Sequence, residues 1–117
     1  MEIPKELLKG SLKSIVLKML SEHDRMYGYE ITQTIDTLSK GSIKLTFGAL
    51  YPILHKLEND GHVQTETEIV NNRTRVYYKL TETGFSTAKE KINELEEFIK
   101  TIRILLNPNI ALELCRS

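Results

Sequence analysis

The sequence predicts a mainly α-helical fold with one small β-hairpin and a long C-terminal helix. Three observations lead to this fold class. Apolar residues recur at three- and four-residue steps over residues 5–21, 46–60 and 81–106. Residues 63–80 instead alternate and are rich in β-branched and aromatic side chains. The length of 117 residues leaves room for one small domain and a helical extension.

Composition and charge exclude several classes of protein. Hydrophobic residues make up 40% of the chain, enough for a folded core, and the single cysteine, Cys115, cannot build a disulfide framework. Glu2, Glu6 and the interruption of an early apolar run by Lys18 leave neither a signal peptide nor a membrane span, so we expect a cytoplasmic protein with no membrane partner. Sixteen basic and sixteen acidic residues cancel, so any case for nucleic-acid binding has to be local.

The titratable residues give no support to catalysis. The three histidines, His23, His55 and His62, have no helical spacing of four residues and no matching set of cysteine or carboxylate ligands. We therefore expect no catalytic residues, no metal site and no cofactor.

Two helices are predicted before residue 40. Pro4 sits where a helix can begin, and the apolar steps predict one continuous helix over about residues 5–21. After a polar turn, Tyr27–Glu30 leads into a short second helix, which Lys40–Ser42 ends. Ile43–Leu45 is then either a very short strand or a plain connection.

The helix predicted for residues 46–60 has two different sides. Thr46 can cap its start, Gly61 can stop it, and its leucines fall on one side. The opposite side is small and nearly uncharged, which suits a helix that lies in a DNA major groove. An amphipathic core helix with a kink at Pro52 is the alternative. The residues across from Leu50 are Gly48, Pro52, His55 and Asn59, with Ala49, Tyr51 and Lys56 beside them.

A β-hairpin is predicted to follow, with strands over residues 63–70 and 75–80 and a tip over residues 71–74. Pairing of Val70 with Arg75 is our assumed register. Between Asn71 and Lys79 there are three basic residues and no acidic one. A hairpin after a helix-turn-helix forms a wing, whose basic residues reach phosphates or the minor groove, although a solvated basic loop is the alternative.

The last predicted helix carries an apolar seam. Thr81 can cap it, and its apolar residues alternate steps of three and four, which is the pattern of a helix that pairs with another helix. We expect homodimerisation, with folding back onto the same domain as the alternative. The predicted division is a DNA-binding domain over 1–80, a dimerisation helix over 81–106 and a tail over 107–117 with no assigned role. The seam consists of Phe85, Ala88, Ile92, Leu95, Ile99, Ile102 and Leu106.

Four motifs in this order resemble the PadR family of bacterial transcriptional regulators. Their combination covers most of residues 8–84 and is more specific than any one motif. The motifs are Leu8-Lys9-Gly10-Ser11-Leu12, Tyr27-Gly28-Tyr29-Glu30-Ile31, Leu50-Tyr51-Pro52-x-Leu54-x-x-Leu57-Glu58-x-x-Gly61 and Tyr77-Tyr78-Lys79-Leu80-Thr81-x-x-Gly84.

The resemblance implies a winged helix-turn-helix that dimerises through its last helix and usually represses transcription. Some members bind a flat aromatic effector through a tryptophan of that helix. This chain has no tryptophan and offers Ile92 and Leu95 instead, so a small-molecule effector is left open but stacking on tryptophan is not expected. By the resemblance, the wing tip and Thr46, Gly48, Ala49, Tyr51, Pro52, His55 and Lys56 face DNA.

Together these features predict a homodimeric winged-helix repressor that binds double-stranded DNA at an inverted-repeat operator. His55 and Thr46 are the candidate readers of bases. Contacts to the DNA backbone are assigned to Tyr51, Lys56, Arg73 and Arg75. A winged helix that binds protein instead of DNA stays open as the rival hypothesis, because the net charge is zero.

Overall fold

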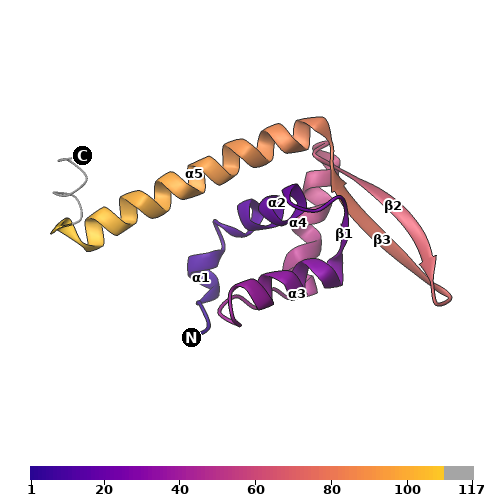
Figure 1. Cartoon of the computed structure of the whole chain (residues 1–117), viewed down its shortest axis with the longest axis horizontal. Helices are drawn as coiled ribbons and strands as arrows, with labels where there is room; N and C mark the ends of the chain where they lie inside the picture. Colours follow the sequence, from indigo (N-terminus) through magenta and orange to yellow (C-terminus); the bar gives the residue numbers. More distant parts are fainter. Residues whose placement is uncertain (110–117) are drawn as a thin grey trace.

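The structure, a computed structural model, describes residues 1–109, so the predicted tail is covered only as far as Asn109. Within this range the chain forms both helices and strands (Figure 1). They are α1 (Lys5–Leu8), α2 (Leu12–Ser21), β1 (Met26–Tyr27), α3 (Gly28–Leu38), α4 (Phe47–Asn59), β2 (Val63–Val70), β3 (Arg73–Leu80) and α5 (Glu82–Leu106).

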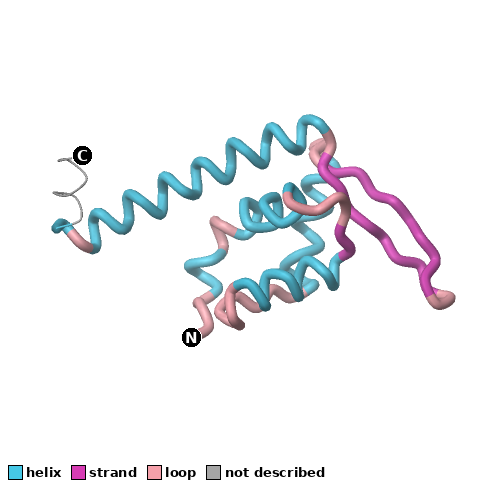
Figure 2. Tube along the Cα trace, viewed as in Figure 1, coloured by secondary structure: helices cyan, strands magenta, loops and turns pink. Residues whose placement is uncertain are grey.

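The elements form a helical body with a sheet at one end. The hairpin of β2 and β3 projects from that end, and α5 packs along α2 and continues past the body (Figure 1). Most of the chain is helical, and the strands lie together on one side (Figure 2). This arrangement confirms the predicted fold class, a mainly α-helical winged helix-turn-helix with a long last helix. No helix within residues 1–109 combines the length and the apolar character needed to cross a membrane.

The predicted single helix over residues 5–21 is wrong. The structure has two helices there, α1 and α2, separated by a turn in which the Ser11 amide donates to the Leu8 carbonyl at 2.8 Å. Gly10 lies in this turn, and glycine costs about 1 kcal/mol in a helix interior relative to alanine. The Ile3 amide also donates to the Ser42 carbonyl at 2.8 Å, which ties the N-terminus to the loop after α3.

The hairpin turn is shorter than predicted, and the assumed register is wrong by two residues. Val70 pairs with Arg73, so the turn contains only Asn71 and Asn72. Both have positive φ angles, 50° and 63°, which asparagine tolerates better than most residues and which a two-residue hairpin turn requires. Because side chains alternate with a period of two, the shift leaves every residue on its predicted face.

The sheet has a third strand that the sequence did not predict. β1 pairs antiparallel with β3, so the strand order is β1-β3-β2. Its two residues pair only with Tyr77 and Tyr78, at the base of the hairpin. Residues 43–45, left open between strand and connection, form a connection.

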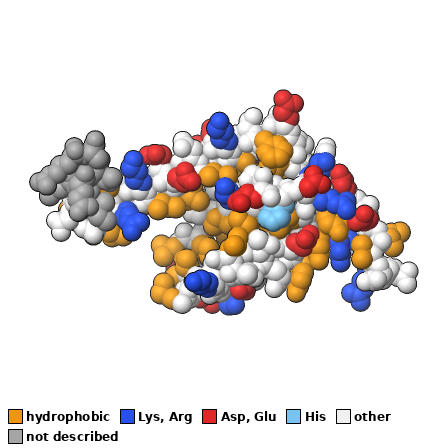
Figure 3. Space-filling model, viewed as in Figure 1, with side chains coloured by type: hydrophobic (Ala, Val, Ile, Leu, Met, Phe, Trp, Pro, Cys, Tyr) orange, Lys and Arg blue, Asp and Glu red, His pale blue; other side chains and the backbone are white. Residues whose placement is uncertain are grey.

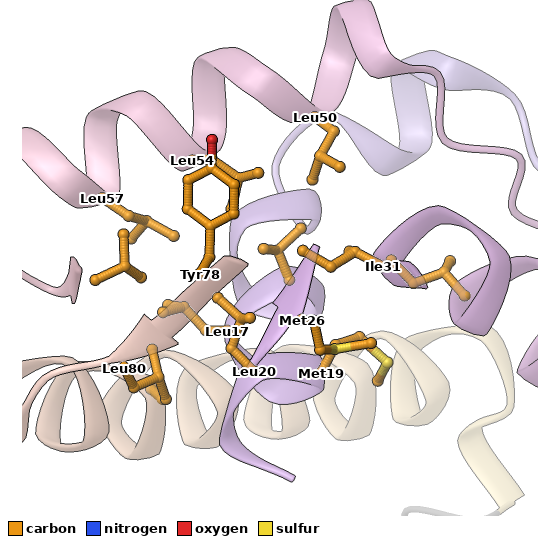
Figure 4. Packing of buried hydrophobic residues seen from close by; sticks show 14 of the residues in the cluster. Leu17, Met19, Leu20, Met26, Ile31, Leu50, Leu54, Leu57, Tyr78 and Leu80 are labelled. Atoms are coloured by element: carbon orange, nitrogen blue, oxygen red, sulfur yellow. The ribbon is translucent and has the colours of Figure 1, made fainter. Parts of the chain in front are cut away.

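The core lies between the helices and the base of the sheet (Figure 4). The predicted inner side of α4 is confirmed, because Leu50, Leu54 and Leu57 are fully buried. These leucines belong to one cluster with the buried side chains of α2 and of the hairpin base. The other members of the core are Val16, Leu17, Met19, Leu20, Met26, Ile31, Ile35, Leu45, Val63, Tyr78, Leu80 and Ala88.

Hydrogen bonds hold the start of α5 against residues 61 and 62, which form the corner between α4 and β2. The Thr81 amide donates to the His62 carbonyl at 3.0 Å, and the Thr81 hydroxyl donates to the Gly61 carbonyl at 2.6 Å. The predicted cap is confirmed, since the Gly84 amide donates to the Thr81 hydroxyl at 3.1 Å. A Cβ atom on Gly84 would overlap the His62 carbonyl oxygen. This corner therefore sets the direction in which α5 leaves the hairpin.

Candidate nucleic-acid interface

The outer side of α4 is open to solvent, as the sequence predicts. The Thr46 hydroxyl accepts a hydrogen bond from the Ala49 amide at 3.2 Å, which confirms the cap. The helix continues through Pro52 to Asn59. Ala49 is half-buried against the core, whereas the other predicted DNA-facing residues of this helix are exposed: Thr46, Gly48, Tyr51, Pro52, His55 and Lys56.

Three rings, those of Phe47, Tyr51 and His55, form a row along the exposed side of α4. We call this row the aromatic file. The ring centroids of Phe47 and Tyr51 are 5.8 Å apart, and those of Tyr51 and His55 are 6.2 Å apart. The spacing of four residues places them one above another on the helix. Phe47 is 46% exposed and Tyr51 is 39% exposed, so two large rings lie together at the surface. The aromatic file is therefore exposed on the side of α4 that was predicted to face DNA.

The Tyr51 side chain also reaches from α4 to the start of α3. Its hydroxyl lies so close to Gly28 that a Cβ atom added there would sit 2.8 Å from the phenolic oxygen. Gly28 is buried at the first position of α3, so a larger residue there would require the Tyr51 side chain to move. The backbone amide of Tyr27 donates to the Glu30 carboxylate at 3.1 Å, which completes the N-terminal cap of α3.

A hollow of about 670 Å³ lies between α4, the start of α3 and the hairpin. We call this feature the wing hollow. Its lining includes Arg73 and Arg75 but no acidic residue, and five of its side chains are aromatic. An anion that entered it would therefore meet the positive charge of two arginines and several phenol groups, with no acidic side chain in the lining itself. The lining residues are Tyr27, Gly28, Tyr29, Phe47, Tyr51, Val70, Asn71, Arg73, Thr74, Arg75, Val76 and Tyr78.

The cations assigned to phosphate contacts differ in their surroundings. Arg73 is exposed, and in the described part of the chain it takes part in no ion pair. Lys56 is paired with Asp60 at 3.2 Å, one turn further along α4. Arg75 is half-buried, and its guanidinium lies over the Tyr27 ring at 4.0 Å. The sequence suggested that both wing arginines can reach phosphates freely. Of the two, Arg73 is exposed, whereas Arg75 is held by the Tyr27 ring.

Arg75 belongs to a cluster of alternating arginine and tyrosine side chains on the outer face of the sheet. Arg75 donates to the Tyr77 hydroxyl at 3.3 Å, and the Tyr27 and Tyr77 rings meet edge to face with centroids 5.5 Å apart. The Arg25 guanidinium lies 3.9 Å from the centre of the Tyr77 ring. We call these four residues, Arg25, Tyr27, Arg75 and Tyr77, the Arg-Tyr cluster.

Two glutamates of β2 complete the surroundings of this cluster. Arg25 bonds Glu66 and Glu68, each at 3.0 Å, and Lys79 approaches the other Glu66 oxygen at 3.5 Å. The hydrogen bond to Glu68 is the first cause that raises the pKa of Arg25, while the bond to Tyr77 is the first that raises the pKa of Arg75. Acidic and basic side chains therefore lie side by side at the hairpin (Figure 3).

The seam of α5 divides into a covered part and an open part. Ala88 is 1% exposed in the chain's own core and Ile92 packs against that core, as the alternative of a helix folding back predicts. Leu95 is half-buried and faces the N-terminal segment, and hydrophobic side chains line this side of α5 (Figure 3). The exposed members of the seam are Phe85 near its start and Ile99, Ile102 and Leu106 near its end, with Phe98 and Leu105 beside them.

Some residues of this surface were missed at the level of sequence. Tyr29 lines the wing hollow, and Phe47 begins the aromatic file. The spacing of four between Phe47, Tyr51 and His55 was available as a signal, since it places the three rings on one stripe. No local pattern pointed to Arg25, because its partners lie 41 and 43 positions away.

Comparison with known proteins agrees with this architecture. The transcriptional regulator Rv3488 of Mycobacterium tuberculosis is 29% identical over 98 residues, which cover 84% of this chain and 88% of that protein. The structure of a transcriptional regulator from Clostridium thermocellum superposes with a TM-score of 0.76 at 27% identity, covering 85% of this chain and 96% of that one. A PadR family transcriptional regulator from Eggerthella lenta gives a TM-score of 0.71 at 26% identity, covering 87% of each chain.

The family assignment rests on the larger part of the sequence. The pattern of the family described as "Transcriptional regulator PadR-like family" matches residues 16–90, from the middle of α2 to the first part of α5. This range includes α4, the hairpin and the lining of the wing hollow. The chain therefore belongs to the PadR-like family of transcriptional regulators.

Proposed function

We propose that this regulator binds double-stranded DNA sequence-specifically as a homodimer, occupies an inverted-repeat operator and represses transcription in the cytoplasm. The wing hollow is the observation that carries the proposal. It combines two arginines and several phenol groups between α4 and the hairpin, and its lining has no acidic residue. A DNA backbone that follows the hollow while α4 enters the major groove meets both elements at once.

Each element has a distinct part in this proposal. Gly48 and Pro52 are small and exposed, so the backbone of α4 can approach base edges closely. Thr46 and His55 carry the donors and acceptors that can read those edges. Tyr51, Lys56 and Arg73 contact phosphates, and Lys56 exchanges Asp60 for a phosphate on binding.

The homodimer is supported by the open end of α5. Ile99 is 54% exposed and Leu106 is 80% exposed, although both are large apolar residues. Neighbouring apolar side chains extend this surface, and exposed apolar patches of this kind are typical of protein interfaces. Two-fold symmetry then presents two copies of α4 to two half-sites, which is why we expect an inverted repeat. Repression needs only that the dimer occupies a promoter.

His55→Ala is expected to change sequence preference. The imidazole is exposed on the outer side of α4, where a donor or acceptor can reach a base edge. Loss of one such contact costs about 1–3 kcal/mol at one base position and little elsewhere. Binding to a set of operators with single base changes measures this. A uniform loss across all operators, or none, would remove His55 from the readers.

Arg73→Ala is expected to weaken binding to every sequence by a similar factor. A phosphate contact carries no base information, and its loss reduces the slope of log affinity against log salt by about one. Titration at several salt concentrations, with Lys89→Ala as a control on an exposed part of α5 outside the hollow, measures the slope. An unchanged slope would show that Arg73 does not contact phosphate.

The test of the proposed function is selection from a random-sequence duplex library at two salt concentrations, with the oligomeric state followed by sedimentation. Enrichment of an inverted repeat whose binding falls steeply with salt is the expected result. Absence of any enriched sequence, with a dimer present, would overturn it in favour of a winged helix that binds protein. Addition of the enriched site to a promoter and measurement of transcription then tests repression.

A further inference from the structure

The outer half of the hairpin has little backbone or apolar support. Within residues 1–109, β1 pairs with β3 only at Tyr77 and Tyr78, so residues 73–76 of β3 have no third strand beside them. The buried residues of the hairpin lie at its base, whereas Ile69 and Val76 are 76% and 39% exposed. Side-chain contacts on the outer face are therefore what can hold this half against the body.

The Arg-Tyr cluster supplies these contacts across all three strands. Arg75 on β3 stacks on Tyr27, which belongs to β1 and caps α3. Arg25 precedes β1, crosses the Tyr77 ring and reaches the carboxylates of β2. The two arginines thus run in opposite directions across the sheet, one towards α3 and one towards the far strand. Together they tie both strands of the hairpin to the segment from which α3 starts.

The surroundings of Arg75 differ from those of a free phosphate contact. Its guanidinium is held by a ring face and by a phenol oxygen, and a move towards a phosphate would give up both contacts. Arg73, two residues away on the same face of the same strand, makes no such contacts with any residue that the structure describes. The two wing arginines are therefore matched in charge and strand but differ in what holds them.

We propose that Arg75 is a positioning residue: it and Arg25 hold the wing at a fixed angle to α3 and α4, and Arg75 acts on DNA through Arg73. The proposal rests on the proposed function, since the positioned group is the phosphate contact of Arg73. The two arginines, for which the sequence predicts the same role, thereby have different roles: Arg73 contacts phosphate and Arg75 positions the wing. The Arg-Tyr cluster thereby sets where the wing meets the DNA backbone.

A double-mutant cycle on DNA binding separates the two roles. If Arg75 acts through Arg73, Arg73→Ala and Arg75→Ala each weaken binding by about tenfold, and the double variant is no weaker than the worse single variant by more than about twofold. Independent phosphate contacts would instead multiply to about a hundredfold, and that outcome would overturn the proposal. Whether the two losses of DNA affinity add is a sharp test, because a general loss of stability would not make these two losses overlap.

A second variant removes the cluster without changing any charge. Tyr77 does not line the wing hollow, so Tyr77→Leu leaves every proposed DNA contact in place. It is expected to weaken binding by about the same factor as Arg75→Ala, and the two changes together should be no worse than one. Binding by Tyr77→Leu equal to that of the unchanged protein would contradict a positioning role.

Hydrogen exchange without DNA tests the same cluster independently. Peptides that cover residues 63–80 should exchange about three- to tenfold faster in Arg75→Ala and Tyr77→Leu, while those of α2 and α4 stay unchanged. Arg73→Ala is the matched control and should exchange as the unchanged protein does. Equal exchange in all variants would overturn the proposal. Failure of the unchanged protein to bind any DNA would instead be seen first, and would count against the proposed function.

Discussion

Gly84→Ala is expected to destabilise the folded chain by about 3 kcal/mol or more. The new methyl group would overlap the carbonyl oxygen of His62, which is backbone and cannot swing aside. Relief requires the start of α5 to move away from the corner. That movement gives up the bond from the Thr81 amide to the His62 carbonyl and those from the Thr81 and Thr83 hydroxyls to the Gly61 carbonyl, at 2.6 and 3.0 Å.

Gly10→Ala is the matched control for this experiment. A Cβ atom on Gly10 has nothing within 4 Å, and its φ angle is not positive. The same chemical change is therefore expected to leave stability within about 1 kcal/mol of the original. Chemical denaturation of the three proteins, followed by circular dichroism, gives the free energies of unfolding. Equal stability of the two variants would mean that the corner yields, and that Gly84 does not fix it.

Ile99→Glu is expected to separate the proposed homodimer and to weaken binding to the proposed operator by about a hundredfold or more. Ile99 is 54% exposed in the single chain, so a glutamate costs the monomer little. In a two-fold interface the change buries two like charges near one another, each without a partner. Each monomer then has to bind its half-site alone. Sedimentation measures the first effect, and titration with an inverted-repeat duplex measures the second.

Thr101→Glu is the control for this change. Thr101 is exposed on the same helix and receives the same charge, but two residues along it lies about 200° round the helix from Ile99. It should leave both the dimer and its affinity for DNA close to those of the unchanged protein. A dimer that persists in Ile99→Glu would exclude this part of the seam from the interface and would direct attention to Phe85, the exposed seam residue near the start of α5.

Local chemistry made some parts of the fold predictable. Both caps, Thr46 and Thr81, were found because a hydroxyl before an apolar helical pattern has one common use. The exposed side of α4 followed from its helical period. The break at Gly10 was missed because the apolar steps continue through it, and the weak helix propensity of one glycine did not outweigh that pattern.

Other features leave no signal in nearby residues, or leave one that the periodicity of apolar residues does not detect. A register shifted by two residues keeps every side chain on its face, so the alternation in β2 and β3 fits both registers, and only the turn chemistry of Asn71 and Asn72 separates them. β1 has two residues, too few to show a period. The role of Arg75 depends on Tyr27, 48 positions earlier, so the sequence grouped it with Arg73 by charge alone.

The hydrogen bonds that hold the start of α5 against residues 61 and 62 have a mechanical consequence. A helix of 25 residues is about 37 Å long. In a dimer joined at its far end, α5 acts as a lever, and a tilt of about 5° there displaces the base of the wing by about 3 Å. Hydrogen bonds to phosphate tolerate only a few tenths of an ångström. A small change in the packing between the far ends of the two α5 helices can therefore release DNA. Each helix-turn-helix would move as a rigid body without changing its own structure.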